Sequence, residues 1–394
     1  MKKSRILFPL LLSFGCILLT SLAVKSQIPP LEIVTKEKPN LDFDEQIWSS
    51  KKDRDSLIGS INNSLSFLRS KKAIDAYQKY PIPEITRERV IQSLLRFRSL
   101  LKTASSPEQL KISIDKEFNL YQAVGQDPQK TVIFTGYYEP IYEGSLTPTQ
   151  EYRYPIYKKP SNFASWTHPQ PTRVQLEGQD GLSSPNNLLA GSELVWLKNR
   201  MQAYLVEIQG SATIKLTDGS SITVGFDDAT DYPYVSIGKM LLKDRVLQPN
   251  QISLAKVVDY LNANPSIENE YISRNNRFVF FRETHGSGPR GSIGVVLTAE
   301  RSIATDKSLM PPGALAIIHT QIPQINQGLI TKPEVNRYVL DQDAGSAIKG
   351  TGRVDIFMGT GKTAGERAGL IKYPGQLYYL LLKESIAQNL KSQL

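Results

Sequence analysis

The sequence predicts a mainly β protein with a helical segment ahead of the β region. Three observations support this prediction: 24 prolines and 26 glycines among 394 residues, a change from helical to strand-like spacing near residue 131, and several short strands closed by Pro or Gly. The length and the 40% hydrophobic content leave room for two domains, each with its own core. The net charge of +9 favours an anionic partner, and the absence of a dense Lys/Arg run interleaved with aromatics argues against nucleic acid.

The N-terminus has the form of an export signal. Lys2, Lys3 and Arg5 precede an apolar run over residues 6–24, so we expect residues 1–26 to be a signal peptide or an uncleaved membrane anchor. Cys16 is the only cysteine and lies in a poor lipidation motif, which leaves an ordinary signal-peptide cysteine and a lipidated one both open. Residues 27–52 are polar with several prolines, and this composition predicts a flexible tether.

Residues 53–140 predict helices followed by the first strand of the β region. Helical spacing recurs at Leu57, Ile61, Leu65 and Leu68, and again over residues 90–101. The sequence Ser106-Pro107-Glu108-Gln109 is a capping box that opens a further helix. We assign these helices to packing rather than to a site.

The β region contains one strong turn signal. Residues 203–228 alternate apolar and polar side chains on both sides of Asp218-Gly219, which predicts a β-hairpin. Residues 236–242 and 252–262 predict helices, and strands resume at residue 277. Residues 376–383 fit either a last strand or a last helix.

Two aspartates lie in strand-like runs on either side of a glycine-rich crossing, AGSAIKGTG. Asp343 follows LDQ, and Asp355 lies between Val354 and Ile356. An apolar setting raises the pKa of a carboxyl group, so we expect Asp355 to hold a proton near neutral pH. A protonated carboxyl in a cleft is what general-acid cleavage of a glycosidic bond needs. Asp306 precedes a Pro-Pro-Gly turn, and this position favours a structural role for it.

Other chemistries find little support. GTGKT at 359–363 lacks the first glycine of a phosphate loop, because Ile356 occupies that position. The sequence DAG at 343–345 occurs once, whereas an aspartic protease needs two such loops. The histidines at 168, 285 and 319 do not have metal-ligand spacing, and removal of the signal would remove the only thiol. We therefore expect no metal and no cofactor.

Several ordered blocks resemble the membrane-bound lytic murein transglycosylase A family, with its C-terminal domain called 3D after three aspartates. The resemblance spans residues 130 to 383, and the matching segments are FTGYYEP (134–140), YPIYKKP (154–160), VEIQGSATIKLTDGS (206–220), SIGKML (236–241), NRFVFFRE (276–283), GSIGVVLTAERSIATDKSLMPPGA (291–314), DQDAGSAIKGTGRVDIFMGTG (341–361) and ERAG (366–369). The order and number of blocks make it specific.

The resemblance implies a double-psi β-barrel domain, completed by residues 276–390, with a second β-barrel inserted over residues 141–275 and a groove between them. It also implies cleavage of the β-1,4 bond between N-acetylmuramic acid and N-acetylglucosamine in peptidoglycan, with a 1,6-anhydro end as product. Asp355 matches the family's catalytic aspartate, while Asp343 and Asp306 match the two that organise the site.

A single acid suffices for this reaction because the sugar's own 6-hydroxyl attacks, whereas a hydrolase needs a second carboxylate. The expected sugar-binding residues are Tyr137, Tyr138, Gln209, Ser211, Lys349 and Gly350. Since adjacent strand residues alternate, one of the two tyrosines should point into the protein.

The expected partners are peptidoglycan strands, with other cell-wall enzymes as further candidates. The expected location is the periplasm, with anchoring to the outer membrane through the N-terminus as an option. Two alternatives stay open: a non-catalytic, expansin-like wall-binding protein, and a hydrolase of the same glycan.

Overall fold

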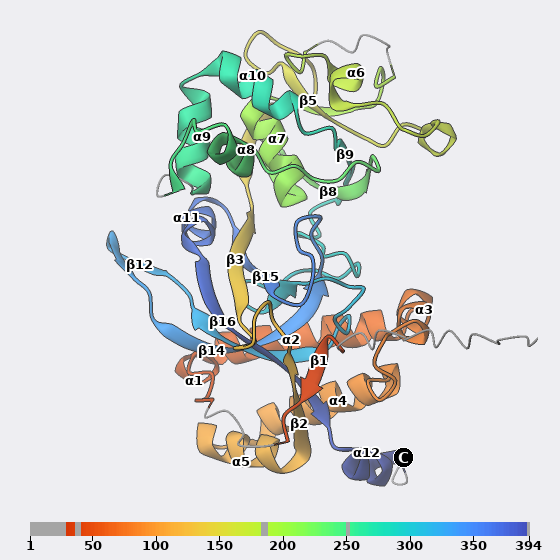
Figure 1. Ribbon diagram of the computed structural model, residues 1–394, viewed down its shortest axis with the longest axis vertical. Coiled ribbons are helices and arrows are strands. Elements are labelled where there is room, and N and C mark those ends of the chain that lie inside the picture. The colour runs from red at the N-terminus through yellow and green to blue at the C-terminus, as the bar shows by residue number, and fades with distance from the viewer. Residues whose placement is uncertain (1–28, 36–40, 183–187, 250–252, 392–394) are drawn as a thin grey trace, which may run out of the picture.

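The computed structural model describes residues 29–35, 41–182, 188–249 and 253–391. Two sheets stacked along the long axis form the two halves of the molecule, and most of the N-terminal helices lie beneath the lower sheet (Figure 1). The predicted signal or anchor (1–26) and Cys16 lie outside the described residues. No helix within the described ranges is long and apolar enough to cross a membrane.

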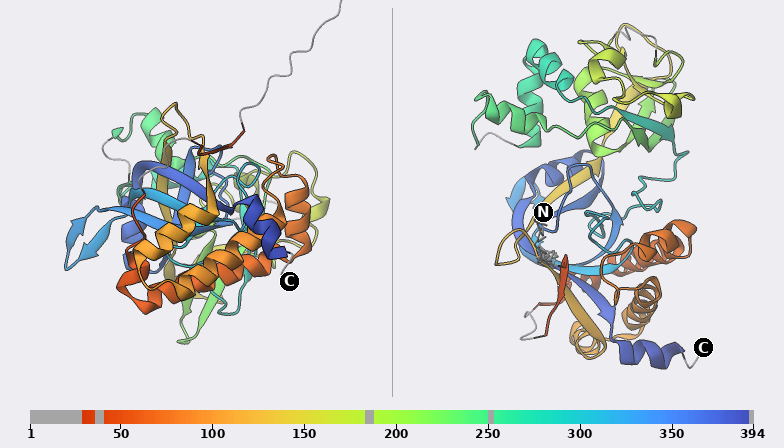
Figure 2. Two further views of the ribbon diagram at one scale, coloured as in Figure 1. Left: turned by 90° about the horizontal axis from the view of Figure 1, so that it is seen from below. Right: turned by 45° about the vertical axis from the view of Figure 1, so that its right-hand side comes forward.

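The lower sheet has eight strands, and six of them close into a barrel. Its order is β1 (Leu31–Ile33), β2 (Phe118–Ala123), β16 (Lys372–Leu382), β11 (Leu315–Gln321), β14 (Glu334–Asp343), β10 (Ser302–Ala304), β15 (Arg353–Thr360) and β3 (Val132–Glu139). Strand β3 pairs with β15 on one side and with β16 on the other, so the run from β16 to β3 closes on itself (Figure 2). Strands β12 (Gln324–Asn326) and β13 (Leu329–Thr331) form a separate hairpin.

The upper sheet has six strands, in the order β5 (Tyr154–Tyr157), β6 (Glu193–Leu197), β4 (Ile141–Ser145), β7 (Ser211–Leu216), β8 (Ser221–Ala229) and β9 (Val279–Glu283). A parallel bridge between Lys158 and Phe281 connects its two ends. The hairpin predicted around Asp218-Gly219 is confirmed as β7 and β8, and Gly219 has the positive φ of 88° that its turn requires. Strand β9 lies in this sheet, although we expected residues from 276 onward to belong to the C-terminal domain.

The helices before the barrel lie where the sequence spacing predicted helices. They are α1 (Gln46–Ser49), α2 (Lys51–Leu68), α3 (Lys71–Gln78), α4 (Arg87–Thr103) and α5 (Pro107–Glu117). Ser106 caps α5 by accepting from the Gln109 N–H, as the capping motif predicted. The apolar faces of α2 and α4 pack in the same core as the barrel strands.

The remaining helices are α6 (Arg173–Glu177), α7 (Arg200–Gln209), α8 (Ile237–Lys243), α9 (Leu254–Asn262), α10 (Pro265–Ser273), α11 (Lys362–Leu370) and α12 (Glu384–Lys391), with a 3₁₀ turn at Phe163–Ser165. Helices α8 and α9 match the prediction, and residues 376–383 prove to be a strand rather than a helix. Residues 203–209 were wrongly predicted as a strand. They belong to α7, which Asn199 caps at one end and which Gly210 ends in the left-handed conformation.

The predicted tether over residues 27–52 is wrong for its described part. Strand β1 pairs with β2, and the Asp44 side chain is completely buried. Asp44 forms ion pairs with Arg301 and Arg337 of the barrel and accepts the Tyr338 N–H. A buried carboxylate is stable only with such partners, so these contacts fix the segment to the barrel.

Candidate functional site

Asp355 lies on β15 with its carboxyl group at a cleft, and its side chain is 20% exposed. Its chain neighbours Val354 and Ile356 are buried. Burial raises the pKa of Asp355 to about 6, the Arg353 guanidinium opposes the rise, and the charge of Asp343 adds to it. Arg353 Nε lies 3.4 Å from Asp355 Oδ1, while Arg353 Nη2 donates to Thr135 Oγ1. Asp355 is therefore an acid that titrates close to neutral pH.

Asp343 ends β14 and is held by three donors. Its Oδ2 accepts from the Tyr137 hydroxyl at 2.7 Å, and its Oδ1 accepts from the N–H groups of Ser292 and Ala344 at 2.7 and 2.8 Å. Burial raises the pKa of Asp343, and these hydrogen bonds oppose the rise. A carboxyl group that only accepts hydrogen bonds fits the ionised form, so Asp343 supplies a fixed negative charge.

The two aspartates face the same residue from opposite sides. Ala304 of β10 is the in-register partner of Asp343 on β14 and of Asp355 on β15. Two interstrand spacings therefore separate the two backbones, roughly 10 Å. Ala304 also lines the cleft, and its methyl group leaves open space between the carboxyl groups.

The cleft has a volume of about 550 Å³ and is lined by residues of both halves of the molecule. Four of the six predicted sugar-binding residues line it: Tyr137, Gln209, Ser211 and Lys349. The first three come from β3, the end of α7 and the start of β7, and Lys349 comes from the glycine-rich crossing. The Tyr137 ring also contacts Phe357, with 5.4 Å between ring centroids.

The other two predicted sugar-binding residues do not line the cleft. The Tyr138 ring points to the opposite face of β3, where it packs so closely on Gly365 of α11 that a Cβ there would come within 2.7 Å of it. Gly350 uses its N–H to donate to Asp306 Oδ2. The structure therefore places Tyr138 and Gly350 outside the cleft lining, contrary to the predicted site.

Asp306 lies beside the site rather than in the cleft lining. Its Oδ1 accepts from the N–H and hydroxyl of Ser308, so it is the turn residue that the sequence indicated. Burial acts to raise the pKa of Asp306, but the hydrogen bonds from Ser308 and Gly350 lower it below its ordinary value. Its bond to the Gly350 N–H connects β10 to the crossing that carries Lys349.

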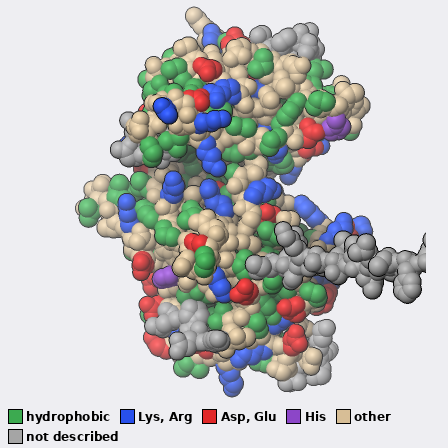
Figure 3. Space-filling model, in the orientation of Figure 1, with side chains coloured by type: hydrophobic (Ala, Val, Ile, Leu, Met, Phe, Trp, Pro, Cys, Tyr) green, Lys and Arg blue, Asp and Glu red, His purple; other side chains and the backbone are tan. Residues whose placement is uncertain are grey.

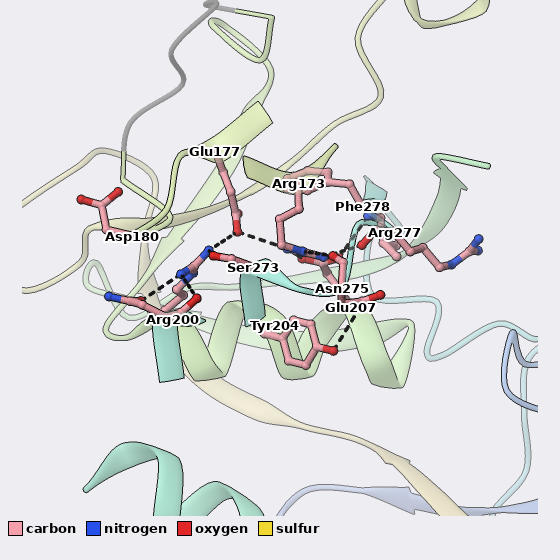
Figure 4. Close-up of polar contacts among 12 residues, drawn as sticks. Arg173, Glu177, Asp180, Arg200, Tyr204, Glu207, Ser273, Asn275, Arg277 and Phe278 are labelled. Carbon is pink, nitrogen blue, oxygen red and sulfur yellow. Dashed lines mark hydrogen bonds and ion pairs between the residues drawn. The ribbon is translucent and has the colours of Figure 1, made fainter. Parts of the chain in front are cut away.

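A buried ion-pair network supports the upper wall of the cleft (Figure 4). Arg173 donates to both carboxylate oxygens of Glu207 on α7, at 2.8 and 2.6 Å, and Glu207 Oε2 also accepts from the Val279 N–H of β9. Glu177 pairs with Arg173 and with Arg200. Sequence reasoning missed this network, because it joins residues far apart in the sequence, such as Arg173 and the Arg277 carbonyl, 104 positions away.

Sequence reasoning also missed four cations in the cleft lining, namely Lys72, Arg277, Arg282 and Arg290. Lys and Arg side chains gather at the waist between the two halves (Figure 3). Arg282 pairs with Asp227, and Arg277 extends away from the Arg173–Glu207 pair (Figure 4). The cleft therefore combines one near-neutral acid, one fixed anion and a cationic lining.

Two family models match the chain. The MltA specific insert domain covers residues 133–282, and the 3D domain covers residues 301–381. Together they contain most of the cleft-lining residues, including both aspartates. Lys72 and Arg290 lie outside both.

Among curated proteins, the chain is 31% identical over 263 residues to a membrane-bound lytic murein transglycosylase A homolog of Buchnera aphidicola, covering 66% of this chain and 69% of that one. It is 29% identical to the membrane-bound lytic murein transglycosylase A of Vibrio cholerae, covering 68% and 70%.

Two solved structures are similar to this chain over most of its length. A membrane-bound lytic murein transglycosylase from Agrobacterium tumefaciens superposes with a TM-score of 0.62 at 26% identity, covering 76% of this chain and 85% of that one. Escherichia coli MltA with bound chitohexaose superposes with a TM-score of 0.67 at 22% identity, covering 89% and 94%, and this likeness shows the fold.

Proposed function

Because the chain belongs to the membrane-bound lytic murein transglycosylase A family, we propose that its cleft cleaves the β-1,4 bond between N-acetylmuramic acid and N-acetylglucosamine in peptidoglycan and leaves a 1,6-anhydromuramic acid end. The observation that carries the proposal is the state of Asp355. It is a carboxylic acid at the cleft wall with a pKa that burial raises to about 6, so it holds a proton in part of the molecules near neutral pH.

Asp355 acts first as an acid and then as a base. Its proton goes to the glycosidic oxygen as the bond from that oxygen to C1 of the muramic acid breaks. The 6-hydroxyl oxygen of the same sugar then bonds to C1 and loses its proton to the Asp355 carboxylate. The acid is regenerated and no water enters the product.

Asp343 supplies charge rather than a nucleophile. Its oxygens are engaged by Tyr137, Ser292 and Ala344, so it is held as an anion near the developing positive charge at C1. The C-terminal end of α7 also lies at the cleft through Gln209 and Gly210, and the negative end of the helix dipole favours the same charge. Asp306 organises the site by fixing Gly350 beside Lys349.

Sugar contacts come from the remaining cleft residues. The Tyr137 ring offers an apolar face, and the Ser211 hydroxyl offers a hydrogen bond to a hydroxyl or acetamido group. Gln209 Oε1 accepts from the Tyr138 N–H, which leaves its NH₂ group for the glycan. Lys349 adds a cation.

The six closed strands are of the double-psi type in this proposal, and the upper six-stranded sheet is the inserted barrel. The closure of β3 on both β15 and β16 supports the first point, and the bridge between Lys158 and Phe281 supports the second.

The protein works in the periplasm, held to the outer membrane by its N-terminus. The basic and apolar residues 1–24 and the membrane-bound relatives support this placement. The net charge of +9 suits an anionic sacculus. Other cell-wall enzymes are candidate partners. An intact-mass measurement of the native protein tests the anchor, because removal of the signal and acylation of Cys16 give different masses.

Digestion of sacculi by the parent protein and by Asp355→Asn tests the reaction. We expect anhydromuropeptides from the parent, none from the variant, and equal binding of sacculi by both. Equal activity of the variant would refute the role of Asp355. A reducing muramic acid end from the parent would make the protein a hydrolase, and binding with no product from the parent would make it a wall-binding module.

A further inference from the structure

Part of the cleft lining comes from segments outside both matched regions. Lys72 of α3 donates through Nζ to the Ser292 carbonyl at 2.6 Å. Arg290 donates through Nη1 to the Gly294 carbonyl at 2.8 Å, and Ser292 and Gly294 both line the cleft. Ser292 also donates its N–H to Asp343, so a single residue connects Lys72 to the fixed anion of the site.

The cations of this cleft differ in what they pair with. Arg282 forms an ion pair with Asp227. Arg173, which lies behind the cleft wall, forms an ion pair with Glu207. Within the part of the chain that the structure describes, Lys72, Arg277, Arg290 and Lys349 form no ion pair with a carboxylate, although all four line the cleft.

Arg277 illustrates the cost of this arrangement. It is half-buried, and its Nη1 reaches only the carbonyls of Thr230 and Tyr232, at 3.2 and 3.5 Å. Burial lowers the pKa of Arg277, and the charges of Glu207 and Asp228 oppose the fall only in part, so the folded protein disfavours the charge of Arg277. An anionic ligand in the cleft would offset that cost.

We propose that Lys72, Arg290, Arg277 and Lys349 bind carboxylates carried by the glycan strand, so that the enzyme prefers strands bearing peptide stems to uncharged chitin-type strands. This inference rests on the proposed function, because it assumes that a peptidoglycan strand occupies the cleft. Peptidoglycan has two sources of carboxylate: the peptide stems, and the lactyl group of muramic acid when no stem is attached.

The position of the cations favours this ligand over a membrane surface. They line a concave space of about 550 Å³ that also contains Asp343 and Asp355, and a flat bilayer surface does not enter such a space. Lys72 contacts Ser292, which in turn contacts Asp343, so a carboxylate bound by Lys72 would lie close to the site.

The test compares the parent with the double variant Lys72→Gln, Arg290→Gln on three ligands. These are intact stem-bearing sacculi, strands stripped of stems by an amidase, and chitohexaose. Lys71→Gln is the matched control, because Lys71 is the adjacent lysine on the same helix, is 90% exposed and pairs with Asp75 outside the cleft. Binding is measured for all three ligands, and anhydro product for the first two.

We expect the double variant to bind sacculi about three- to twentyfold more weakly, the loss produced by two partly exposed ion pairs, and to bind chitohexaose like the parent. The loss should shrink in high salt. A loss confined to sacculi identifies the stem carboxylates as the ligand, and an equal loss on stripped strands shows that the freed lactyl carboxylate binds in their place. Unchanged binding of sacculi, or an equal loss on chitohexaose, would overturn the inference. If only this inference fails, the parent and the double variant both still form anhydro ends at saturating substrate. If the proposed function fails, the parent itself forms no anhydro ends.

Discussion

Asp343 and Asp355 lie on strands β14 and β15, and each is the in-register partner of Ala304 on the strand between them. This register places an anion held by three donors beside an acid whose pKa burial raises to about 6. The charge of Asp343 contributes to that rise. The two carboxyl groups therefore differ in their surroundings, and the proposed reaction uses them differently.

Asp343→Asn keeps the shape of the side chain and removes its charge. We expect kcat to fall by about 10² to 10³, the loss typical of one electrostatic contact with a developing charge. The initial rate of anhydromuropeptide release measures this. Glu334→Gln, at the exposed far end of the same strand, is the control and should retain full activity. A parental kcat in the Asp343→Asn variant would show that the fixed charge has no part in catalysis.

Arg353→Gln changes the pH at which the enzyme works. Arg353 lowers the pKa of Asp355, so its removal raises that pKa. The acid must be protonated to act, and the protonated fraction falls as pH rises through the pKa. The basic limb of the pH–rate profile should therefore move to higher pH, while Lys362→Gln on the exposed surface of α11 leaves it in place. A shift of the basic limb to lower pH would show that Arg353 does not lower the pKa of Asp355.

Asp355→Asn should stabilise the folded protein above pH 6. The pKa of Asp355 is raised on folding, so its contribution is most favourable below the unfolded pKa, and stability is lost as pH rises from about 4 towards 6. A rise of about two pH units corresponds to roughly 2–3 kcal/mol at pH 7. Asparagine carries no charge and avoids this cost. Thermal melts at pH 4 and pH 7.5 test it: the melting temperatures of parent and variant should be similar at the lower pH and differ by a few degrees at the higher one. A destabilised variant at pH 7.5 is the contrary result.

We expect the barrel of the Asp44→Ala variant to unfold more easily than that of the parent. The substitution leaves Arg301 and Arg337 buried without their shared carboxylate, and breaking a buried ion pair costs about 3–5 kcal/mol. Urea denaturation followed by tryptophan fluorescence measures the change. The control is Asp42→Ala, an exposed residue two positions away, whose effect should be within about 0.5 kcal/mol. Similar midpoints for the two variants would mean that the Asp44 segment does not stabilise the barrel.

Asp355 and Asp343 could be singled out from the sequence because their signals are local, and the structure places both at the cleft. An acid between apolar strand residues, and glycines beside it, can be identified without knowing the rest of the fold. The sequence also indicated that one of Tyr137 and Tyr138 faces inward, but only the pairing of β3 with β15 and the packing of α11 decide which one.

Contacts between residues far apart in the sequence could not be predicted from local sequence patterns. Lys72 reaches the site through Ser292, 220 positions away, and its helix has no feature that distinguishes it from a packing helix. Helix α7 could have been predicted, since Asn199 and Gly210 are a start signal and a stop signal. The apolar run at 203–206 and the alternation at 207–209 suggested a strand instead. Asp44 was assigned to a tether because a buried charge cannot be identified before its partners are known.

In the proposed reaction the sugar's own hydroxyl, and not water, attacks C1. Digestion of sacculi in water labelled with oxygen-18, followed by mass spectrometry of the released muropeptides, tests it most directly. We predict ends lighter by one water than reducing ends and without oxygen-18, and Asp355→Asn should release none of them. Oxygen-18 at C1 of the released muramic acid would show instead that water attacks.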